Sequence, residues 1–596
     1  MDKNTVWAIV LSTIVIIAAY FVTPLFFGNK DAVAEETASE IVIEKENVPA
    51  KAEVSNSIFS ESEIAVLEGS DEEVLSEEKI TFNTNHAEIV FTTKGGDILS
   101  YKLKNHIDMD TQEGVQISDN VNELNRTCAL ALGGADNKII DEVFAYEMVN
   151  ENTILFKKNF SVTDKNGNRK SFMLGKKYTF NPDDFMFKLD ILIHSNDGSG
   201  LDFNGAAYTL RTSPQIGPHY DPKQNKYENR QFVAYNGKKA KKLVLSNGQF
   251  KRYDKEVLWG GIAGKYFIEL VVPGTTAIWN SAYYSSKVEV NDYANAQALF
   301  ERTAFTGSDI QDTYYMYFGP RNEKDLKKYN VADNNPWRLS GNRLTESLQS
   351  SGMLSWLETI LKWCLEMLHK IIPNWGVCII VVTIVLKVVL FPLSIKQSKS
   401  TMKMQALQPK LQAIQKKYAD DQQKMQTETQ KIYQEAGYNP ASGCLPMIFQ
   451  FVVLIAMYNL FNNYFEFRGS MFIPKWIPDL TVGDSVYKFK FNLPLLGNQL
   501  RLLPIIYVAT QIISTKITQV GTPQGQNNMN MKMMTYGMPI LFFFLFYNAP
   551  SGLLLYWLTS NIWQVGQQLV INKMMATGKI KDDTNTKKLP PKGKKK

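Results

Sequence analysis

Cysteine and histidine, which build many catalytic and metal sites, are both scarce in this chain. Four cysteines among 596 residues are too few to staple a scaffold with disulfides. Four of the five histidines lie in the N-terminal half, and none has metal-ligand spacing to another histidine or cysteine: His86, His106, His194 and His219. We therefore expect no metal centre and no catalytic residue of these types.

A nucleotide-binding loop is also missing. Gly264 and Lys265 resemble the end of a phosphate loop, but Trp259 stands where glycine is required and Tyr266 where serine or threonine is required. The sequence therefore predicts no cofactor.

The net charge changes sign along the chain. Residues 31–80 hold 15 acidic residues against 3 lysines, whereas residues 572–596 hold 9 lysines against 2 aspartates. Such opposite extremes exclude a uniformly basic DNA-binding protein and favour an asymmetric membrane protein.

The N-terminus carries an apolar run, Val6–Phe27, whose 22 residues include no charge. That length crosses about 30 Å of hydrocarbon. A cleaved signal peptide is the alternative, but the run is longer than a signal's apolar region and no small-x-small site follows Phe27. We expect a transmembrane anchor at 1–28, followed by an acidic, disordered linker at 29–80.

A β-rich region follows, at 81–340. In Phe185–His194 apolar residues occupy every second position, and turn pairs such as Asn166-Gly167 and Asn247-Gly248 punctuate similar runs. This pattern predicts a large all-β antiparallel sandwich.

The C-terminal half is apolar again. Residues 353–372 have a one-sided polar stripe, which predicts an amphipathic helix in the membrane interface or, alternatively, one packed on the β-domain. The next run, 375–395, is a predicted transmembrane helix that contains Lys387. A cation near mid-bilayer costs about 2.5–3.5 kcal/mol, so Lys387 is a candidate functional residue unless it only snorkels to the interface. Thr383 lies one turn before it, on the same face.

Four more predicted transmembrane helices follow, at 443–464, 502–520, 533–547 and 552–570. They contain polar and aromatic residues that avoid lipid: Gln450, Gln511, Tyr556, Trp557, Asn561 and Gln564. These side chains predict a shared polar cavity, or else hydrogen bonds that join helices.

Lysine counts set the predicted topology. Residues 396–439 hold 8 lysines against 4 acidic residues, and the tail 571–596 is strongly basic. Six spans with both termini in the cytoplasm place these segments inside, and place the β-domain, the linker and the loop 465–501 outside. That loop holds five basic residues, so it departs from the tendency of basic residues to lie on the cytoplasmic side.

The segment 396–439 has a heptad pattern in two halves, which predicts an antiparallel cytoplasmic helical hairpin with coiled-coil packing. The apolar positions are Met404, Leu407, Leu411, Ile414 and Tyr418, then Met425, Thr429, Ile432 and Ala436.

Three stretches in the C-terminal half resemble the YidC/Oxa-type membrane protein insertases. They are WGVCIIVVTIVLKVVLFPLSIKQSKSTMKMQALQPKLQAIQKKY, NPASGCLPMIFQ and APSGLLLYWLTSNIWQVGQQ, in order and with the expected spacing across about 353–573. The anchor, linker and β-domain resemble the form found in bacteria with two membranes, whose extracytoplasmic domain is a β-supersandwich. Trp259–Phe267 weakly resembles a stretch of it.

The resemblance implies a non-enzymatic insertase with a five-helix core around a hydrophilic groove. Lys387 stands where the family usually has arginine, and Thr383, Gln450 and Tyr556 match groove positions. Trp557 replaces a frequent second tyrosine, Phe451 replaces a frequent proline, and Gln511 is a weaker match. Lysine keeps the positive charge of arginine but not its bidentate geometry.

The implied partners are nascent membrane proteins and a Sec-type translocon. The hairpin is expected to contact the ribosome, and the basic tail to contact either the ribosome or anionic lipids; a role of the tail as a plain positive-inside anchor stays open. Two rival classes stay open, a small-molecule transporter and a sensor with a sugar-binding β-domain. A transporter would show repeated, Gly/Pro-broken helices, which are not evident, and a sensor leaves the polar residues of the apolar helices unexplained.

Overall fold

The computed structural model describes most of the chain between residues 64 and 577. The residues it leaves out in that span are 70–75, 109–110, 136, 165–168, 196–197, 220–227, 229, 244–248, 254–256, 275–278, 287–296, 349–353, 439, 494–495 and 519–532. The predicted anchor at 1–28, most of the predicted linker and the tail beyond 577 lie outside the described residues. The described chain forms two compact units, Asn56–Lys362 with Ala456–Ser470, and Trp363–Ile455 with Met471–Lys596.

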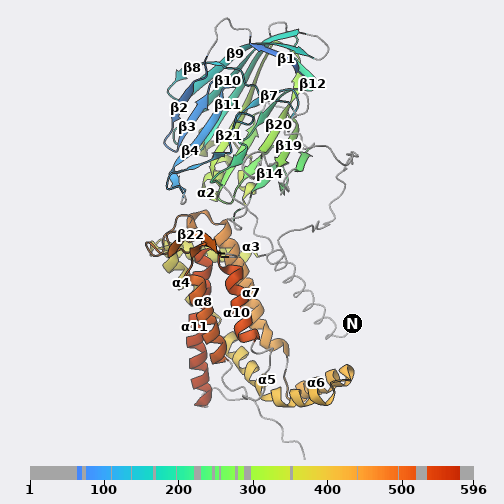
Figure 1. Cartoon of the computed structure of the whole chain (residues 1–596), viewed down its shortest axis with the longest axis vertical. Helices are drawn as coiled ribbons and strands as arrows, with labels where there is room; N and C mark the ends of the chain where they lie inside the picture. Colours follow the sequence, from blue (N-terminus) through green and yellow to red (C-terminus); the bar gives the residue numbers. More distant parts are fainter. Residues whose placement is uncertain are drawn as a thin grey trace, which may run out of the picture. The chain divides into compact units, whose positions relative to one another are not determined.

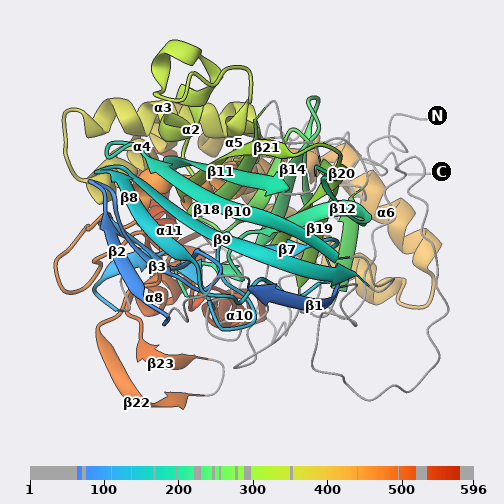
Figure 2. The same ribbon diagram turned by 90° about the horizontal axis from the view of Figure 1, so that it is seen from above.

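The first unit is built on antiparallel β-sheets, which confirms the predicted β-rich region (Figures 1 and 2). The largest sheet comprises β1 (Ile64–Gly69), β8 (Ala145–Asn150), β9 (Thr153–Asp164), β10 (Arg169–Phe180), β11 (Met186–Ser195), β14 (Gln231–Tyr235), β15 (Ala240–Leu243), β17 (Trp259–Ala263), β18 (Phe267–Pro273) and β21 (Asp309–Pro320). Their order is β1-β9-β10-β11-β21-β18-β17-β14-β15, with β8 also paired to β9.

Smaller sheets complete this unit. A five-stranded sheet contains β7 (Leu130–Leu132), β12 (Leu201–Arg211), β16 (Gln249–Tyr253), β19 (Trp279–Ser286) and β20 (Gln297–Phe305). A four-stranded sheet runs β2 (Lys79–Asn83), β3 (Ala87–Thr92), β4 (Asp97–Ile107) and β5 (Gly114–Gln116), and β6 (Ser118–Asp119) pairs with β13 (Gln215–Ile216). Helix α2 (Glu323–Lys327) and short 3-10 turns at Lys328–Asn330, Ala332–Asn334 and Leu344–Ser347 follow the last strand.

The core of the β-unit comes from residues of all three larger sheets. Along β11 the side chains of Phe187, Leu189, Ile191 and Ile193 are buried, as the alternation predicts. Rings from different sheets meet there, such as Tyr101 and Phe318 with centroids 5.2 Å apart. A single apolar cluster therefore joins the sheets into one domain.

One boundary prediction is wrong. Strand β1 lies inside the predicted disordered linker, where its residues pair antiparallel with β9 from Ile64↔Asp164 to Gly69↔Phe160. Composition averaged over 29–80 hides the short run IAVLEG, whose backbone groups complete an edge of the sheet.

The helical elements are α3 (Ser355–His369), α4 (Trp375–Val389), α5 (Phe391–Lys417), α6 (Gln422–Glu435), α7 (Pro440–Asn463), α8 (Leu503–Thr518), a π-helical turn at Met533–Gly537, α10 (Met538–Phe546) and α11 (Ser551–Ala576). Helix α11 lies against α4 and α8 (Figure 1). Along α3 the side chains of Leu357, Leu361 and Leu365 are buried and those of Trp356 and Trp363 exposed, so two apolar faces flank its polar residues. Its place in a membrane interface stays a prediction.

The predicted continuous span 375–395 is broken in the structure. Helix α4 ends at Val389, and α5 begins at Phe391 and ends at Lys417. The first part of α5, Phe391–Ser400, makes an angle of 58° with α4. Pro392 at the start of α5 lacks the N–H that a continuous helix would require. No single described helix is both long and apolar enough to cross a membrane, whereas α4 with the first part of α5 meets that test as a bent pair.

Helices α5 and α6 contact each other in the predicted hairpin segment. The first helix begins at Phe391 rather than after residue 395, and the predicted heptad positions are its less exposed ones, with Leu407 and Leu411 buried. Coiled-coil packing of this hairpin stays a prediction.

The predicted loop 465–501 contains elements that were not predicted. A 3-10 turn spans Phe465–Phe467, and strands β22 (Tyr487–Leu493) and β23 (Gly497–Leu500) form an antiparallel hairpin. In both views the hairpin projects sideways from α8, α10 and α11 (Figures 1 and 2).

Candidate functional site

Lys387 extends from the last turn of α4 toward α7. The side chain of Asn374 caps the start of α4 by accepting a hydrogen bond from the backbone N–H of Val377, at 3.1 Å. Lys387 Nζ donates a hydrogen bond to Oε1 of Gln450 on α7, at 3.2 Å. The cation is half-buried and held by a neutral amide.

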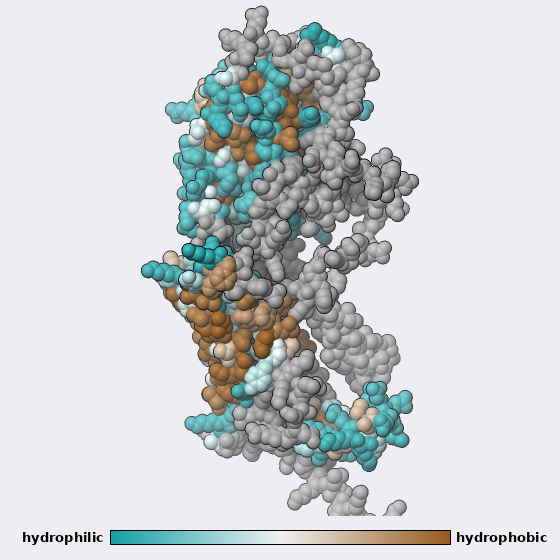
Figure 3. All heavy atoms as spheres, in the orientation of Figure 1, coloured by the Kyte–Doolittle hydropathy of each residue, from teal (hydrophilic) through white to brown (hydrophobic). Residues whose placement is uncertain are grey.

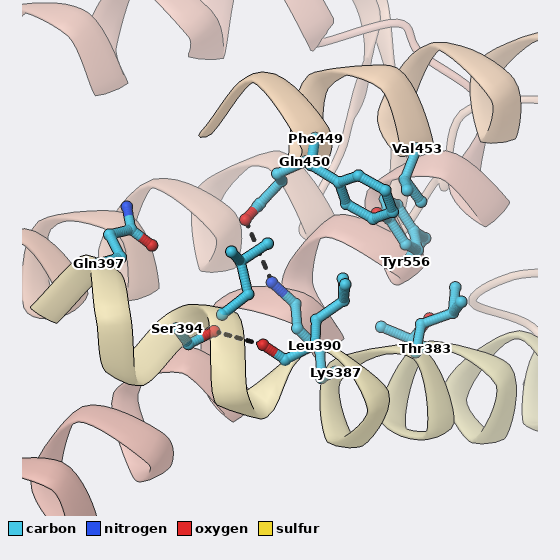
Figure 4. A pocket seen from close by; sticks show the side chains of 11 residues that line it. Thr383, Lys387, Leu390, Ser394, Gln397, Phe449, Gln450, Val453 and Tyr556 are labelled. Carbon is cyan, nitrogen blue, oxygen red and sulfur yellow. Dashed lines mark hydrogen bonds between the residues drawn. The ribbon is translucent and has the colours of Figure 1, made fainter. Parts of the chain in front are cut away.

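A pocket surrounds this pair (Figure 4). The pocket opens to solvent, and its empty volume, counted together with that open space, is about 480 Å³. Helices α4, α5, α7 and α11 line it. The lining residues are Thr383, Leu386, Lys387, Leu390, Leu393, Ser394, Gln397, Phe449, Gln450, Val453 and Tyr556. Lys387 is the one charged residue among them.

Two hydroxyl groups of the pocket each donate to the backbone carbonyl four residues earlier. Thr383 is 1% exposed, and its Oγ1 donates a 2.6 Å hydrogen bond to the carbonyl of Ile379 in its own helix. Ser394 Oγ likewise donates to the carbonyl of Leu390, at 3.3 Å. Both hydroxyl oxygens can still accept a hydrogen bond, so a bound polar group can donate to them while Lys387 donates to that group.

Four of the predicted site residues come together in this pocket: Lys387, Thr383, Gln450 and Tyr556. The other four, all on α8 and α11, do not line it. Asn561 donates a 2.8 Å hydrogen bond to Gln511, which matches the alternative that polar residues join helices. Gln564 is half-buried farther along α11.

Trp557 also lies outside the pocket. Its ring packs among Tyr507, Phe542 and Phe546, with centroid distances of 4.7, 5.8 and 5.0 Å. Adjacent residues on a helix point about 100° apart, so Tyr556 faces the pocket and Trp557 faces α8 and α10.

Sequence reasoning missed Ser394 and Gln397. Both lie on α5, beyond the break after Val389, so their place in the pocket depends on the bend between α4 and α5, which the periodicity of one helix does not encode. The prediction had assigned them to the end of a span and the start of a loop.

On the face that Figure 3 shows, hydrophobic residues gather over the helical part of the chain. Exposed examples are Val385, Val388, Val389, Ile505, Ile513, Ile540, Leu541, Phe544, Ile562, Leu569 and Val570. A surface this apolar is unusual for a protein in water and typical of one that faces lipid. No group of three His, Cys, Asp or Glu side chains among the described residues is arranged to hold a metal ion.

Comparisons with known proteins match both halves of the chain. The family model described as the 60Kd inner membrane protein matches residues 367–579, and the YidC periplasmic domain matches residues 79–363. The membrane protein insertase YidC of Treponema denticola is 42% identical over 96% of this chain and 100% of its own length. That of Treponema pallidum is 36% identical over 96% of this chain and 99% of its own.

Among solved structures, one described as an active YidC insertase with the first transmembrane domain resolved covers 83% of this chain and 92% of its own. Its identity is 19% and its TM-score 0.35. The curated relatives are named as insertases, a non-enzymatic function. With relatives this similar along almost their whole length, the chain belongs to the YidC family of membrane protein insertases.

Proposed function

We propose that this protein inserts newly made membrane proteins by offering the pocket around Lys387 to their hydrophilic ends. The observation that carries the proposal is the Lys387–Gln450 contact in an open pocket lined also by Thr383 and Tyr556. Because the ammonium group of Lys387 faces polar side chains and not lipid, placing it there costs less free energy, and it can bind the hydrophilic end of a substrate.

The physical problem of insertion is the polar flank of the incoming segment. That flank must cross about 30 Å of hydrocarbon, where unpaired polar groups cost several kcal/mol each. A pocket that supplies a cation, amides and hydroxyls partway shortens the apolar distance. The segment's apolar part then moves into lipid, driven by roughly 25 cal/mol for each Å² of apolar surface buried.

The charge of Lys387 selects the substrates that gain most. An acidic flank is attracted to the ammonium as to a point charge, and this needs no bidentate fork. Two unit charges about 6 Å apart attract by about 2.8 kcal/mol at an effective dielectric constant near 20. Losing that attraction slows insertion about a hundredfold.

Reconstitution into liposomes tests this proposal. The full chain and its Lys387→Arg and Lys387→Glu variants are compared on two single-span substrates that differ only in an acidic or a neutral flank. Insertion is measured as protease protection. Lys387→Arg should insert both substrates as the parent does, whereas Lys387→Glu should slow insertion of the acidic-flank substrate alone by about a hundredfold or more, because the attraction is lost and like charges repel.

Two outcomes contradict the proposal. Equal activity of the Glu variant on both substrates would remove the charge from the mechanism, and an equal loss on both would indicate a structural defect. Because these liposomes hold no other protein, the same assay tests action alone, and adding a Sec-type translocon tests the cooperative route.

We also propose the orientation that the lysine counts indicate, with the β-unit outside the cytoplasm and the α5–α6 hairpin inside, where it meets nascent chains and the ribosome. Protease treatment of intact spheroplasts checks this: cleavage within the hairpin from the outer side would contradict it.

A further inference from the structure

The hairpin β22–β23 exposes an aromatic face that nothing in the described chain covers. Tyr487, Phe489 and Phe491 alternate along β22, and successive ring centroids lie 5.1 and 5.4 Å apart. Tyr487 and Phe491 are each 61% exposed. A two-stranded hairpin is at best marginally stable in water, so a face of this kind requires a surface to rest on.

The opposite face of the same strand is basic. Lys488 and Lys490 alternate with the aromatic residues, both are exposed, and neither has an acidic partner among the described residues. The two acids of the same segment, Asp479 and Asp484, are buried. The exposed charge of residues 471–501 is therefore entirely positive.

The base of the hairpin is fixed to the helices. Tyr547 at the end of α10 donates a hydrogen bond to the carbonyl of Gln499, at 2.8 Å, and accepts one from the backbone N–H of Arg501, at 3.1 Å. Arg501 Nε donates to Asn548 Oδ1, at 3.0 Å. These contacts hold the base of the hairpin at the end of α10, a helix that exposes the apolar side chains of Leu541 and Phe544.

We propose that the β22–β23 hairpin lies in the membrane interface and binds anionic lipid headgroups. Its aromatic face continues the apolar surface of α10 into the headgroup region, where tyrosine and phenylalanine rings are favoured. Lys488 and Lys490 then reach the lipid phosphates from the other face, as basic side chains do at interfaces. This inference concerns a surface outside the pocket and does not depend on the insertion mechanism.

Hydrogen exchange of the full chain in lipid nanodiscs tests the inference. Nanodiscs of phosphatidylcholine are compared with nanodiscs that also contain phosphatidylglycerol, and exchange is followed by mass spectrometry in peptides covering 486–500. Anionic lipid should slow exchange of these amides by up to about thirty-fold, the effect of two lysines near an anionic surface, and added salt should remove the difference.

Matched variants separate the two faces. Lys488→Gln with Lys490→Gln should abolish the difference between the two lipids, and Tyr487→Ser with Phe491→Ser should raise exchange in both. Lys238→Gln with Lys239→Gln, two exposed lysines of the β-unit, serves as the control and should change nothing. Unchanged exchange in α8 shows that each variant is folded.

Equal exchange of the hairpin in both nanodiscs, whatever the lysines, would overturn headgroup binding. Protection seen only in native membrane vesicles, and in neither nanodisc, would assign the surface to a protein partner and overturn the inference as well.

Discussion

Lys387 and Gln450 show how far single residues could be predicted. A charge within an apolar run is improbable without a function, so Lys387 was evident from the sequence. Gln450 stood out for the same reason. Their contact at 3.2 Å depends on how α4 and α7 pack, which no local pattern encodes. The same limit explains why Gln511 and Asn561, equally polar, were grouped with the pocket although they pair with each other.

Glu269 of β18 is a second residue with an unusual environment. It is fully buried, and its carboxylate accepts hydrogen bonds from the backbone N–H of Ser213, at 3.0 and 3.3 Å. Burial raises the pKa of Glu269 from 4.5 to about 8, against the opposing effect of the Ser213 hydrogen bond.

The raised pKa makes stability depend on pH. Below pH 4.5 the carboxyl group is protonated in both states. Between pH 4.5 and 8 only the unfolded state loses the proton, so the free energy of unfolding falls as pH rises, by up to about 1.4 kcal/mol per unit, and it levels off above pH 8. Glu269→Gln, which keeps the acceptor oxygen, should flatten this slope. Urea unfolding of the full chain, followed by circular dichroism between pH 5 and 8, measures it.

The control for that experiment is Glu147→Gln, at a half-exposed residue of β8. It should leave the slope unchanged. A Glu269→Gln variant that loses stability with pH as steeply as the parent would contradict the assignment.

At the scale of elements, helices were predicted better than their breaks. Apolar runs and heptads overlap the helices that the structure describes between α3 and α11, because apolar runs and one-sided burial leave a strong signal in the sequence. The break at Leu390 was missed although Pro392, inside the apolar run, is a signal for it. Strand β1 was missed because a six-residue strand leaves little signal in an acidic segment. The aromatic–lysine alternation of β22 was readable but overlooked.

Asp484 illustrates an element fixed by a distant residue. Its Oδ2 accepts hydrogen bonds from the backbone N–H groups of Leu502 and Leu503 at the start of α8, at 2.8 and 3.0 Å, and from Trp476 Nε1, at 2.9 Å. The buried carboxylate of Asp484 accepts from backbone N–H groups that have no partner within the helix. Its negative charge also offsets the partial positive charge at the start of α8.

Removing that carboxylate should loosen the first turn of α8. Asp484→Asn keeps the shape but loses the charge, at a cost of about 1 kcal/mol. Asp484→Ala leaves three donors unpaired, of which the N–H of Leu503 is buried, at a cost of roughly 2–3 kcal/mol. Hydrogen exchange at residues 502–506 should rise in that order, with Asp420→Ala, in the exposed turn after α5, as control. No increase in the alanine variant would show that water replaces the cap.

At the scale of the molecule, the division into a β-rich part and a helical part was predictable because each has its own hydrophobic period. The family followed from three motifs in the helical part. What could not be predicted is which polar residues share one cavity, because that requires the packing of four helices. The proposed insertion mechanism depends on that cavity receiving the hydrophilic end of a substrate.

Site-specific photo-crosslinking to a stalled nascent membrane protein tests this claim most directly. Phe449 and Ile455 lie on α7 and are 38% and 37% exposed, but only Phe449 lines the pocket. A photoreactive residue at 449 should capture the acidic flank of the substrate, and one at 455 should capture lipid or the apolar segment. Equal capture of the flank at both positions, or capture at 455 alone, would contradict the account.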